Sequence, residues 1–270
     1  EGYTSTATQT VNSVDSIYSI TYELDGGVMS GTYSGSYSRW SDDIALPESS
    51  AVSRENAVFL YWYELDASGS EVVVTQIDSG STGDRTMYAK WRYTALYVSE
   101  SGSDDNSGST LENAKATLQA ALSAFDASDY ACTVYVSGTV SGVTTIDSSV
   151  ACASLTLCGY TTAQEEDPWL YTRSDWSDGL DGDAGGSVLS VSDDCALSVT
   201  VQYLRLQNGS AENGAGIDMQ GSGTLTLLYA AVCENTASAC GGGINAESGT
   251  VLLTNVCVES NSIEIGRAHV

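Results

Sequence analysis

The sequence is short of histidine, which most catalytic and metal sites use. His269 is the only histidine among 270 residues, and it lies in the last six, Ile265 to Val270. These six residues back-translate into a common sequencing-adapter sequence. We therefore expect residues 265–270 to be adapter read-through and the natural chain to continue past Glu264. Without His269, a Ser-His-Asp or Cys-His catalytic device and a histidine metal cluster are excluded.

Basic residues and long apolar runs are also scarce. Nine Lys and Arg stand against 35 Asp and Glu, which gives a formal net charge of −26. This acidity argues against nucleic acid or an anionic membrane surface as a partner. We find no apolar run long enough for a signal or membrane-spanning segment, so we expect no membrane insertion. The many Ser, Thr, Gly and Tyr residues are typical of a secreted or surface-displayed bacterial chain; the alternative is that the acidity serves solubility alone.

The cysteines form no repeated C-x-x-C pair, so a zinc site is not expected. All seven lie in the second half of the chain. Cys132, Cys158 and Cys257 stand at or beside β-type runs, where cysteine behaves as a small buried hydrophobe. We favour mostly free core thiols. The alternative is one or two disulfides between neighbouring coils, involving Cys233 and Cys240.

A repeat of 26–27 residues occupies the region from Leu197 to Ile263. Gly214–Ile217 returns as Gly241–Ile244, and Leu225 with Leu227 returns as Val251 with Leu253. Asparagines close successive runs of alternating apolar residues, at Asn208, Asn235 and Asn261. Short period-2 strands repeating at this length predict stacked coils that bury one shared core. The fold class that we predict is all-β, with a right-handed parallel β-helix.

The N-terminal region has a different composition. Residues 1–17 are rich in Ser and Thr and are interpreted as a linker, and residues 18–93 form a separate module. Its residues that carry a family resemblance are Tyr-x-Leu-x-Gly-Gly at Tyr22–Gly27, Leu46-Pro47, Phe59-x-x-Trp62-Tyr63 and Tyr-Ala-Lys-Trp at Tyr88–Trp91. The module resembles the Listeria–Bacteroides repeat, also called the internalin B-repeat. One departure is Tyr61, where the family usually has glycine.

That resemblance implies a small β-grasp-like spacer found in tandem on large bacterial surface proteins. Two of its tryptophans, Trp62 and Trp91, are candidates for a face that stacks on sugars. We favour the alternative that both belong to the aromatic core of a small β module.

The second domain is predicted to span residues 96–264, incomplete at its C-terminus. Its entry has the order Tyr97-Val98-Ser99, then Gly102 to Gly108, then a capping box at Ser109–Glu112 that opens a helix. Apolar residues fall on one face of that helix: Leu111, Ala114, Leu118, Ala121, Leu122 and Phe125. This order resembles the N-terminus of pectin-lyase-like domains, in which an α-helix caps the first coil. An open β-helix end exposes core and strand edges, so a cap is physically required.

Later coils resemble the repeats of polymorphic outer-membrane and adhesin-like proteins. The matching residues are Gly-Gly-Gly-Ile at Gly241–Ile244 and Val-x-x-Asn at Val232–Asn235 and Val258–Asn261. Stacked asparagines at a turn hydrogen-bond successive coils and tolerate left-handed backbone geometry. We assign them this structural role and no binding role.

A polar excursion from Thr161 to Gly186 holds the candidate metal ligands. Four aspartates gather there, Asp175, Asp178, Asp181 and Asp183. Clustered carboxylates suit Ca²⁺, which takes six to eight oxygen ligands. The spacing is not that of an EF-hand loop, and we favour a solvated acidic loop without a cofactor.

Two functions are open. The first is a non-catalytic, extracellular or cell-surface adhesin-like protein whose β-helix is a stalk or binding surface for a glycan or another surface ligand. The second is a polysaccharide lyase or glycoside hydrolase on the same scaffold. For a lyase, the resemblance to pectin-lyase-like domains implies Ca²⁺ and an Arg or Lys that takes the proton, which leaves Lys115, Arg173 and Arg205. Arg205 beside Asp218 or Glu234 is the candidate, although such a pair is more often a surface ion pair. A hydrolase requires paired carboxylates, but the adjacent Asp193 and Asp194 point to opposite faces of a strand. We favour the first function.

Overall fold

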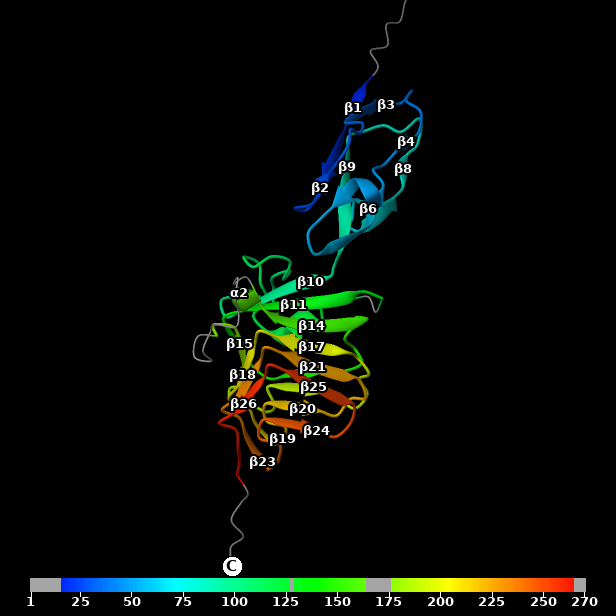
Figure 1. The fold of residues 1–270 in the computed structure, drawn as a ribbon. Helices are drawn as coiled ribbons and strands as arrows, with labels where there is room; N and C mark the ends of the chain where they lie inside the picture. Colours follow the sequence, from blue (N-terminus) through cyan, green and yellow to red (C-terminus); the bar gives the residue numbers. More distant parts are fainter. Residues whose placement is uncertain (1–15, 127–128, 164–175, 265–270) are drawn as a thin grey trace, which may run out of the picture. The chain divides into compact units, whose positions relative to one another are not determined.

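The protein is built almost entirely of β-strands. The computed structural model describes residues 16–126, 129–163 and 176–264. The chain divides into two compact units, Glu1–Arg92 and Tyr93–Val270, which are coloured from blue to cyan and from cyan-green to red in Figure 1. Each unit has its own hydrophobic core, and each is described separately below.

The first unit contains a mixed five-stranded sheet in the order β3-β1-β9-β6-β7. β1 and β9 run parallel, whereas β1–β3 and β6–β7 are antiparallel. Two short antiparallel pairs, β2–β5 and β4–β8, complete it. The bounds are β1 Ile17–Glu23, β2 Val28–Met29, β3 Ser36–Ser38, β4 Ile44–Ala45, a 3-10 turn at Ser49–Ala51, β5 Val52–Ser53, β6 Ala57–Leu65, β7 Glu71–Val74, β8 Gln76–Ile77 and β9 Arg85–Tyr93.

An aromatic core holds this unit together. Trp62 and Trp91 are only 3% and 7% exposed, and Phe59 packs against both rings at centroid distances of 5.3 and 5.6 Å. The indole N–H of Trp62 donates to the Pro47 carbonyl at 2.7 Å. Buried Trp is stable where its N–H finds an acceptor, so these contacts explain why the module keeps both tryptophans inside.

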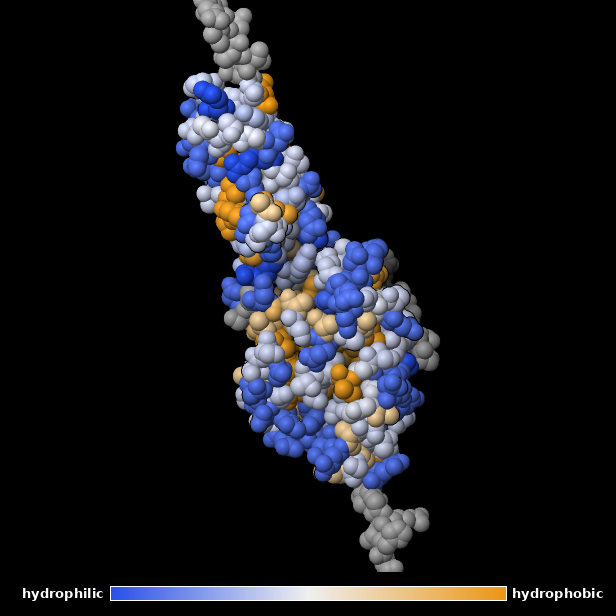
Figure 2. Space-filling view, turned by 180° about the vertical axis from the view of Figure 1, so that it is seen from behind, coloured by the Kyte–Doolittle hydropathy of each residue, from blue (hydrophilic) through white to orange (hydrophobic). Residues whose placement is uncertain are grey.

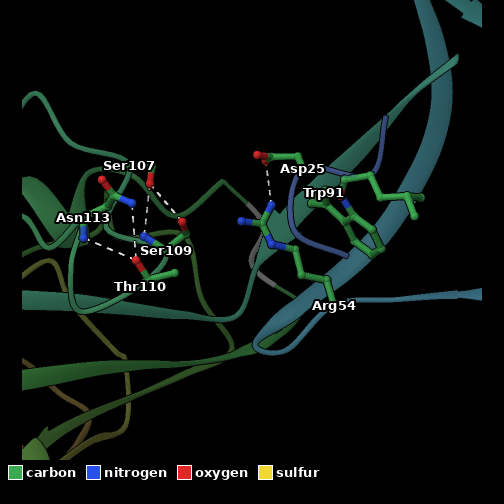
Figure 3. A network of polar contacts seen from close by, with 8 residues as sticks. Asp25, Arg54, Trp91, Ser107, Ser109, Thr110 and Asn113 are labelled. Atoms are coloured by element: carbon green, nitrogen blue, oxygen red, sulfur yellow. Dashed lines mark hydrogen bonds and ion pairs between the residues drawn. The ribbon is translucent and has the colours of Figure 1, made fainter. Parts of the chain in front are cut away.

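Ion pairs link the strands and turns of the first unit at its surface. Arg54 donates to the Asp25 carboxylate at 2.7 Å, as drawn in Figure 3. Lys90 on β9 pairs with Glu71 on β7 at 2.7 Å. Exposed pairs of this kind each contribute at most about 1 kcal/mol, so the aromatic core remains the main source of stability.

The second unit consists of parallel strands that stack in a fixed order, visible as the successive arrows below β10 in Figure 1. The chain passes through the same sheets in turn, and every strand pair in them is parallel. The sheet orders are β10-β11-β14-β17-β21-β25, β12-β15-β18-β22-β26, β13-β16-β20-β24 and β19-β23-β27.

Most strands of this unit have three to seven residues. The first sheet has β10 Ala95–Ser99, β11 Ala131–Ser137, β14 Ser154–Gly159, β17 Val199–Gln202, β21 Thr224–Leu228 and β25 Thr250–Thr254. The second has β12 Thr139–Ser141, β15 Gly179–Asp181, β18 Arg205–Gln207, β22 Ala231–Cys233 and β26 Cys257–Glu259. The others have β13 Thr144–Ile146, β16 Leu189–Val191, β20 Ile217–Met219, β24 Ile244–Ala246, β19 Ser210–Asn213, β23 Thr236–Cys240 and β27 Ser262–Ile263. Two short helices, α1 Leu118–Leu122 and α2 Tyr160–Ala163, accompany them.

The repeat found in the sequence is the register of these sheets. Leu225 pairs with Val199 before it and with Val251 after it, and these alternate side chains point into the core. Ile217 pairs with Ile244, which confirms the alignment of the two glycine-rich segments. The predicted polar excursion from Thr161 to Gly186 is wrong in one respect, because its residues 179–181 form strand β15 in register with β12 and β18.

The corners between strands recur at the same interval. At one corner Tyr203, Tyr229 and Asn255 all have positive φ, between 48° and 57°. At the next corner the positive-φ residues are Asn208, Glu234 and Ser260. Left-handed backbone costs a residue other than glycine roughly 1 kcal/mol or more, so the stacking of whole coils must stabilise these corners. In the first corner the rings of Tyr203 and Tyr229 stack at 5.4 Å and contribute to this.

The loop from Ser99 to Thr117 covers the first coil, and the expected helix is much shorter than the sequence suggested. The capping box at Ser109–Glu112 is wrong: those residues form turns, and α1 starts after Thr117, whose side chain accepts from the Ala120 N–H. Figure 3 shows the local hydrogen bonds that replace it, between Ser107 and Ser109 and between Asn113 and Thr110. Asp104 was not foreseen, and its carboxylate accepts from the Thr117 N–H.

Lys115 forms the second part of this cap. Its backbone pairs with β10 as an edge segment, with its N–H donating to the Tyr97 carbonyl and its carbonyl accepting from the Ser99 N–H, both at 2.9 Å. Gly102 must be glycine because a Cβ there would lie 2.2 Å from the Lys115 carbonyl oxygen. Backbone groups at the edge of the first coil therefore find hydrogen-bond partners within the chain itself, which confirms that this end is capped.

Candidate functional site

The asparagines of the repeat form a buried ladder between coils. The Asn235 side chain is fully buried. Its Oδ1 accepts from the Gly209 N–H at 2.8 Å, and its Nδ2 donates to the Leu206 carbonyl at 3.2 Å and to the Asn261 Oδ1 at 2.9 Å. Asn261 repeats the pattern by donating to the Val232 carbonyl at 2.9 Å. The predicted hydrogen bonding between stacked asparagines is confirmed for this pair.

Asn208 does not belong to the ladder, which corrects the sequence alignment. The true spacing of the ladder is 26, so the position before Asn235 is Gly209. Asn208 lies one residue earlier, at a corner with φ of 56°. A side chain at Gly209 is impossible because its Cβ would lie 1.9 Å from the Ala215 carbonyl oxygen.

The two repeated motifs interlock. A Cβ on Gly216 would lie 2.8 Å from the Nδ2 of Asn235, and a Cβ on Gly243 would lie 2.9 Å from the Nδ2 of Asn261. Each Gly-x-x-Ile segment thus lies against the Val-x-x-Asn segment that follows it in the chain. This contact explains why both motifs recur together in the sequence.

An acidic groove follows the corner at the ends of the second sheet. It has a volume of about 600 Å³. Its lining residues include Asp181, Asp183, Asn208, Glu234 and Glu264. The nearby sheet carries Arg205, whose charge acts on Asp181. With four carboxylates, this groove can accept hydrogen bonds from hydroxyl, amide or cationic groups, and it repels anions.

Asp181 is the best-positioned carboxylate of this groove. Its Oδ2 accepts from the side-chain amides of Gln207 at 2.9 Å and of Asn208 at 2.7 Å, and its Oδ1 accepts from the Asp183 N–H. Burial alone raises the pKa of Asp181, but these hydrogen bonds and the Arg205 charge outweigh burial, so the pKa lies below its ordinary value. Asp181 is thus an anion bound into the scaffold.

The predicted Ca²⁺ ligands have separate surroundings. Asp175 lies outside the described residues. Asp178 is fully buried, and its carboxylate accepts from the backbone N–H groups of Gly138 and Thr161 at 2.9 and 2.6 Å. Asp183 is exposed at a left-handed corner. Within the described ranges no three His, Cys, Asp or Glu side chains are arranged to hold a metal ion. The Ca²⁺ site therefore stays a prediction.

Arg205 and Asp218, the candidate binding pair, lie in different sheets. Arg205 is on β18, and Asp218 is on β20. The Asp218 carboxylate accepts from the side-chain amides of Gln220 at 2.8 Å and of Asn245 at 2.9 Å. Among the described residues, the ion pairs are those of Arg54 with Asp25, Arg85 with Glu64 and Lys90 with Glu71, so none joins Arg205 to Asp218. Sequence reasoning missed Asn245, although its offset of 27 from Asp218 was available as a signal.

The other candidates are also occupied by contacts inside the protein. Trp62 and Trp91 lie in the core of the first unit, and their rings contact Phe59. Lys115 is the other described basic residue among the lyase candidates, and its ammonium donates to the backbone carbonyls of Asp104 and Asn106 at 3.1 and 2.7 Å. These arrangements favour structural roles for all three.

The cysteines are mostly core residues, as the sequence suggested. Cys132, Cys152, Cys158 and Cys195 are buried free thiols, and Cys240 is an exposed free thiol. The alternative, disulfides between neighbouring coils that involve Cys233 and Cys240, is not found for Cys240, because its thiol is free. Their parts of the chain, on β22 and β23, lie on successive sheets of one coil.

The surface of the molecule is polar over most of the face drawn in Figure 2, with hydrophobic colour limited to patches. The larger exposed apolar side chains in the second unit belong mainly to its last coil, at Leu252, Leu253, Val258 and Ile263. None of the helices in the part of the chain that the structure describes has the length and hydrophobicity of a membrane span.

Comparison with known proteins identifies one segment. Searches of curated proteins and of solved structures found no match to this chain. Residues 18–90 match the model of the Listeria-Bacteroides repeat domain family. The match covers the strands β1 to β9 almost completely, and the first unit therefore contains a Listeria-Bacteroides repeat domain.

Proposed function

We propose that this chain is part of a non-catalytic, adhesin-like protein that is secreted or displayed on a bacterial surface. The observation that carries the proposal is the Listeria-Bacteroides repeat at residues 18–90, a domain found on bacterial surface proteins. In this proposal the repeat, with a β-grasp-like fold, is a spacer. The second unit is a stalk and a binding surface.

We also infer that the second unit is a right-handed parallel β-helix of the pectin-lyase-like kind. The support is the uninterrupted parallel pairing from β10 to β25 and the return of the chain to the same sheets. Connections between parallel strands of one sheet are almost always right-handed. The coils of residues 96–264 then form the domain that follows the spacer.

A non-catalytic role is supported by how the polar side chains are used. Asn235 and Asn261 bond to each other and to backbone groups. Asp181 is held by two amides and Asp218 by two others. These groups stabilise the stacking of coils, so their hydrogen-bonding capacity is largely satisfied before any ligand binds.

The acidic groove is the binding surface that we propose. Its carboxylates at Asp183, Glu234 and Glu264 lie on exposed residues. A neutral glycan or a basic surface of another protein fits this charge, whereas nucleic acid and polyuronates are repelled. The partner is then an extracellular ligand, in agreement with the location proposed for the whole protein.

The lyase or hydrolase alternative gains little support from the described residues. A lyase requires a basic group beside bound substrate, but the Lys115 ammonium is held by two carbonyls. Arg205 and Asp218 lie in separate sheets. Asp194 accepts from the Ser148 hydroxyl at 2.5 Å, in a turn between coils.

A depolymerisation assay tests the non-catalytic proposal. The full chain is incubated with polygalacturonate and Ca²⁺, and the ultraviolet absorbance of unsaturated products is followed. We expect no increase above buffer. An increase that the Arg205→Ala variant abolishes would contradict the proposal, because it would place a catalytic base on the coil face. The variant also serves as the control for contaminating lyase, which it would not affect.

A further inference from the structure

The outer face of the first sheet of the second unit is uncharged, although the chain is strongly acidic. Side chains alternate along a strand, so the residues between those of the core point outwards. On β11, β14, β17, β21 and β25 every outward residue is Thr, Ser, Tyr, Gln, Leu, Ala or Cys. By contrast, the outer face of the second sheet carries Asp181, Arg205 and Glu259. The first sheet is therefore a neutral surface on a molecule with a formal charge of −26.

Four threonines stand in one file on this face. Thr133 pairs with Thr156, Thr156 with Thr200, and Thr200 with Thr226, on strands that lie one above another in Figure 1. Neighbouring strands are about 4.8 Å apart, so each step along the coils presents one hydroxyl and one methyl group. The four side chains are half-buried, and β-branched side chains have little freedom at χ1. The file is therefore a preorganised array.

The hydroxyl groups of this file are available to a ligand. Within the part of the chain that the structure describes, none of the four has a hydrogen-bond partner. The amides and carboxylates of the other sheets differ, because Asn235, Asp181 and Asp218 are each held by neighbouring side chains. A hydroxyl both donates and accepts, so the file can bond to a ligand that does the same.

A cluster of tyrosines borders the file. Tyr97 on β10 pairs with Tyr135 on β11, and their rings stack at 5.3 Å. Tyr160 of α2 meets both rings edge to face, at 5.7 and 6.1 Å. Tyr135 lies two residues after Thr133 on the same strand, so the cluster shares the face of the file. Half-buried tyrosines offer apolar ring surface together with a hydroxyl group.

The size of this face selects the kind of partner. Five strands about 4.8 Å apart, with about three outward residues on each, give a surface of roughly 20 by 15 Å, or about 300 Å². A stable protein–protein interface buries about 800 Å² of each partner. The face is therefore too small for a folded protein or a second copy of this chain, but it is long enough for an extended polymer that lies along the coils.

We propose that this face binds a linear neutral glycan, laid along the threonine file and against the tyrosine cluster. Sugar hydroxyls donate to and accept from the threonine hydroxyls, and the C–H groups of the sugar rings pack on threonine methyls and tyrosine rings. The ligand is neutral because the strands of this face carry no charge to pair with an ionic group, and the charge of the chain repels anionic polymers. This surface is additional to the acidic groove, and its test does not depend on where the protein is located.

Affinity electrophoresis of the full chain tests the proposal. Native gels contain glucomannan, xyloglucan, mixed-linkage β-glucan or polygalacturonate. We expect retardation by at least one of the three neutral polysaccharides and none by polygalacturonate. Calorimetric titration with the retarding polysaccharide then gives the dissociation constant. We expect it to change by less than about twofold between about 0.05 and 0.5 M salt, because salt screens charges and this contact has none.

Matched variants locate the binding surface. Thr156→Val together with Thr200→Val removes two adjacent hydroxyls and keeps the β-branched shape, and we expect the dissociation constant to rise about tenfold. Thr133→Val together with Thr226→Val repeats the test in other coils. The control Thr145→Val lies on the outer face of the third sheet, and the control Glu234→Gln lies in the acidic groove. Both controls should leave the constant unchanged.

Four results would overturn the proposal. They are the absence of retardation by all three neutral polysaccharides, binding that both double variants retain in full, and binding that either control weakens as much as the double variants do. The fourth is a doubled mass in light scattering that Thr156→Val with Thr200→Val returns to that of one chain, because this would assign the face to a second copy.

Discussion

Replacing Asn235 with alanine tests whether the asparagine ladder holds the coils together. The change removes the acceptor of the buried Gly209 N–H and one hydrogen bond to the Leu206 carbonyl. A buried polar group left without a partner costs about 1–3 kcal/mol. The free energy of unfolding of the second unit should therefore fall by about 1–3 kcal/mol.

The isosteric change Asn235→Asp separates hydrogen bonding from packing. An aspartate keeps an acceptor for the Gly209 N–H, but it places an oxygen against the Leu206 carbonyl and the Asn261 Oδ1. We expect a loss of stability at neutral pH as large as that of the alanine variant, because a buried charge then meets two acceptors. The neighbouring change Thr236→Ala, which removes one exposed contact with Ser262, should alter stability by less than about 0.5 kcal/mol.

Urea unfolding followed by far-ultraviolet circular dichroism measures these differences. Because stacked coils need not unfold in one step, hydrogen exchange by mass spectrometry supplies a local readout. The peptide that contains Gly209 should exchange faster in Asn235→Ala than in the unchanged chain. If the alanine variant stays within about 0.5 kcal/mol of the unchanged protein and Gly209 keeps its protection, the reasoning is refuted.

Three further predictions concern packing, backbone strain and charge. Gly216→Ala should destabilise the second unit by several kcal/mol, since its Cβ would lie 2.4 Å from the Gly243 carbonyl oxygen. The control is Gly185→Ala, because its Cβ would meet nothing closer than 3.4 Å. This control should leave the urea midpoint nearly unchanged. Glu234→Asn should raise the free energy of unfolding by up to about 1 kcal/mol, because Glu234 has φ of 58° and asparagine tolerates that geometry better. The urea midpoint should rise accordingly, and a lower midpoint would contradict this. The pKa of Asp181 is lowered in the folded state. The ionised carboxylate therefore stabilises the folded protein above its unfolded pKa, and this stabilisation is lost as the pH falls through the folded pKa. In melting experiments below about pH 4, an Asp181→Asn variant should lose less stability than the unchanged chain.

The stacked coils were predictable because their core is a periodic pattern. Leu225 and Val251 alternate with polar neighbours and recur at one spacing, and the structure pairs them directly. The Listeria-Bacteroides repeat was predictable for a different reason, since its short motifs around Trp62 and Trp91 are specific. Both cases depend on local order in the sequence.

The details of the site were not predictable from local order. The 27-residue spacing of Asn208 and Asn235 suggested one ladder, but the ladder keeps the register of the strands, and only Gly209 fits there. The capping box at Ser109–Glu112 does not form, because a residue outside that segment decides where the helix begins. The Asp104 carboxylate accepts hydrogen bonds from the backbone N–H and the hydroxyl of Thr117, and the helix begins after Thr117.

The location of the protein tests the proposed function most directly. Antibodies raised against the full chain are applied to intact cells of the source organism, before and after treatment with an external protease, and to its culture medium. The account predicts labelling of intact cells that protease removes, or protein in the medium. Labelling that appears only after the cells are lysed would contradict the surface role.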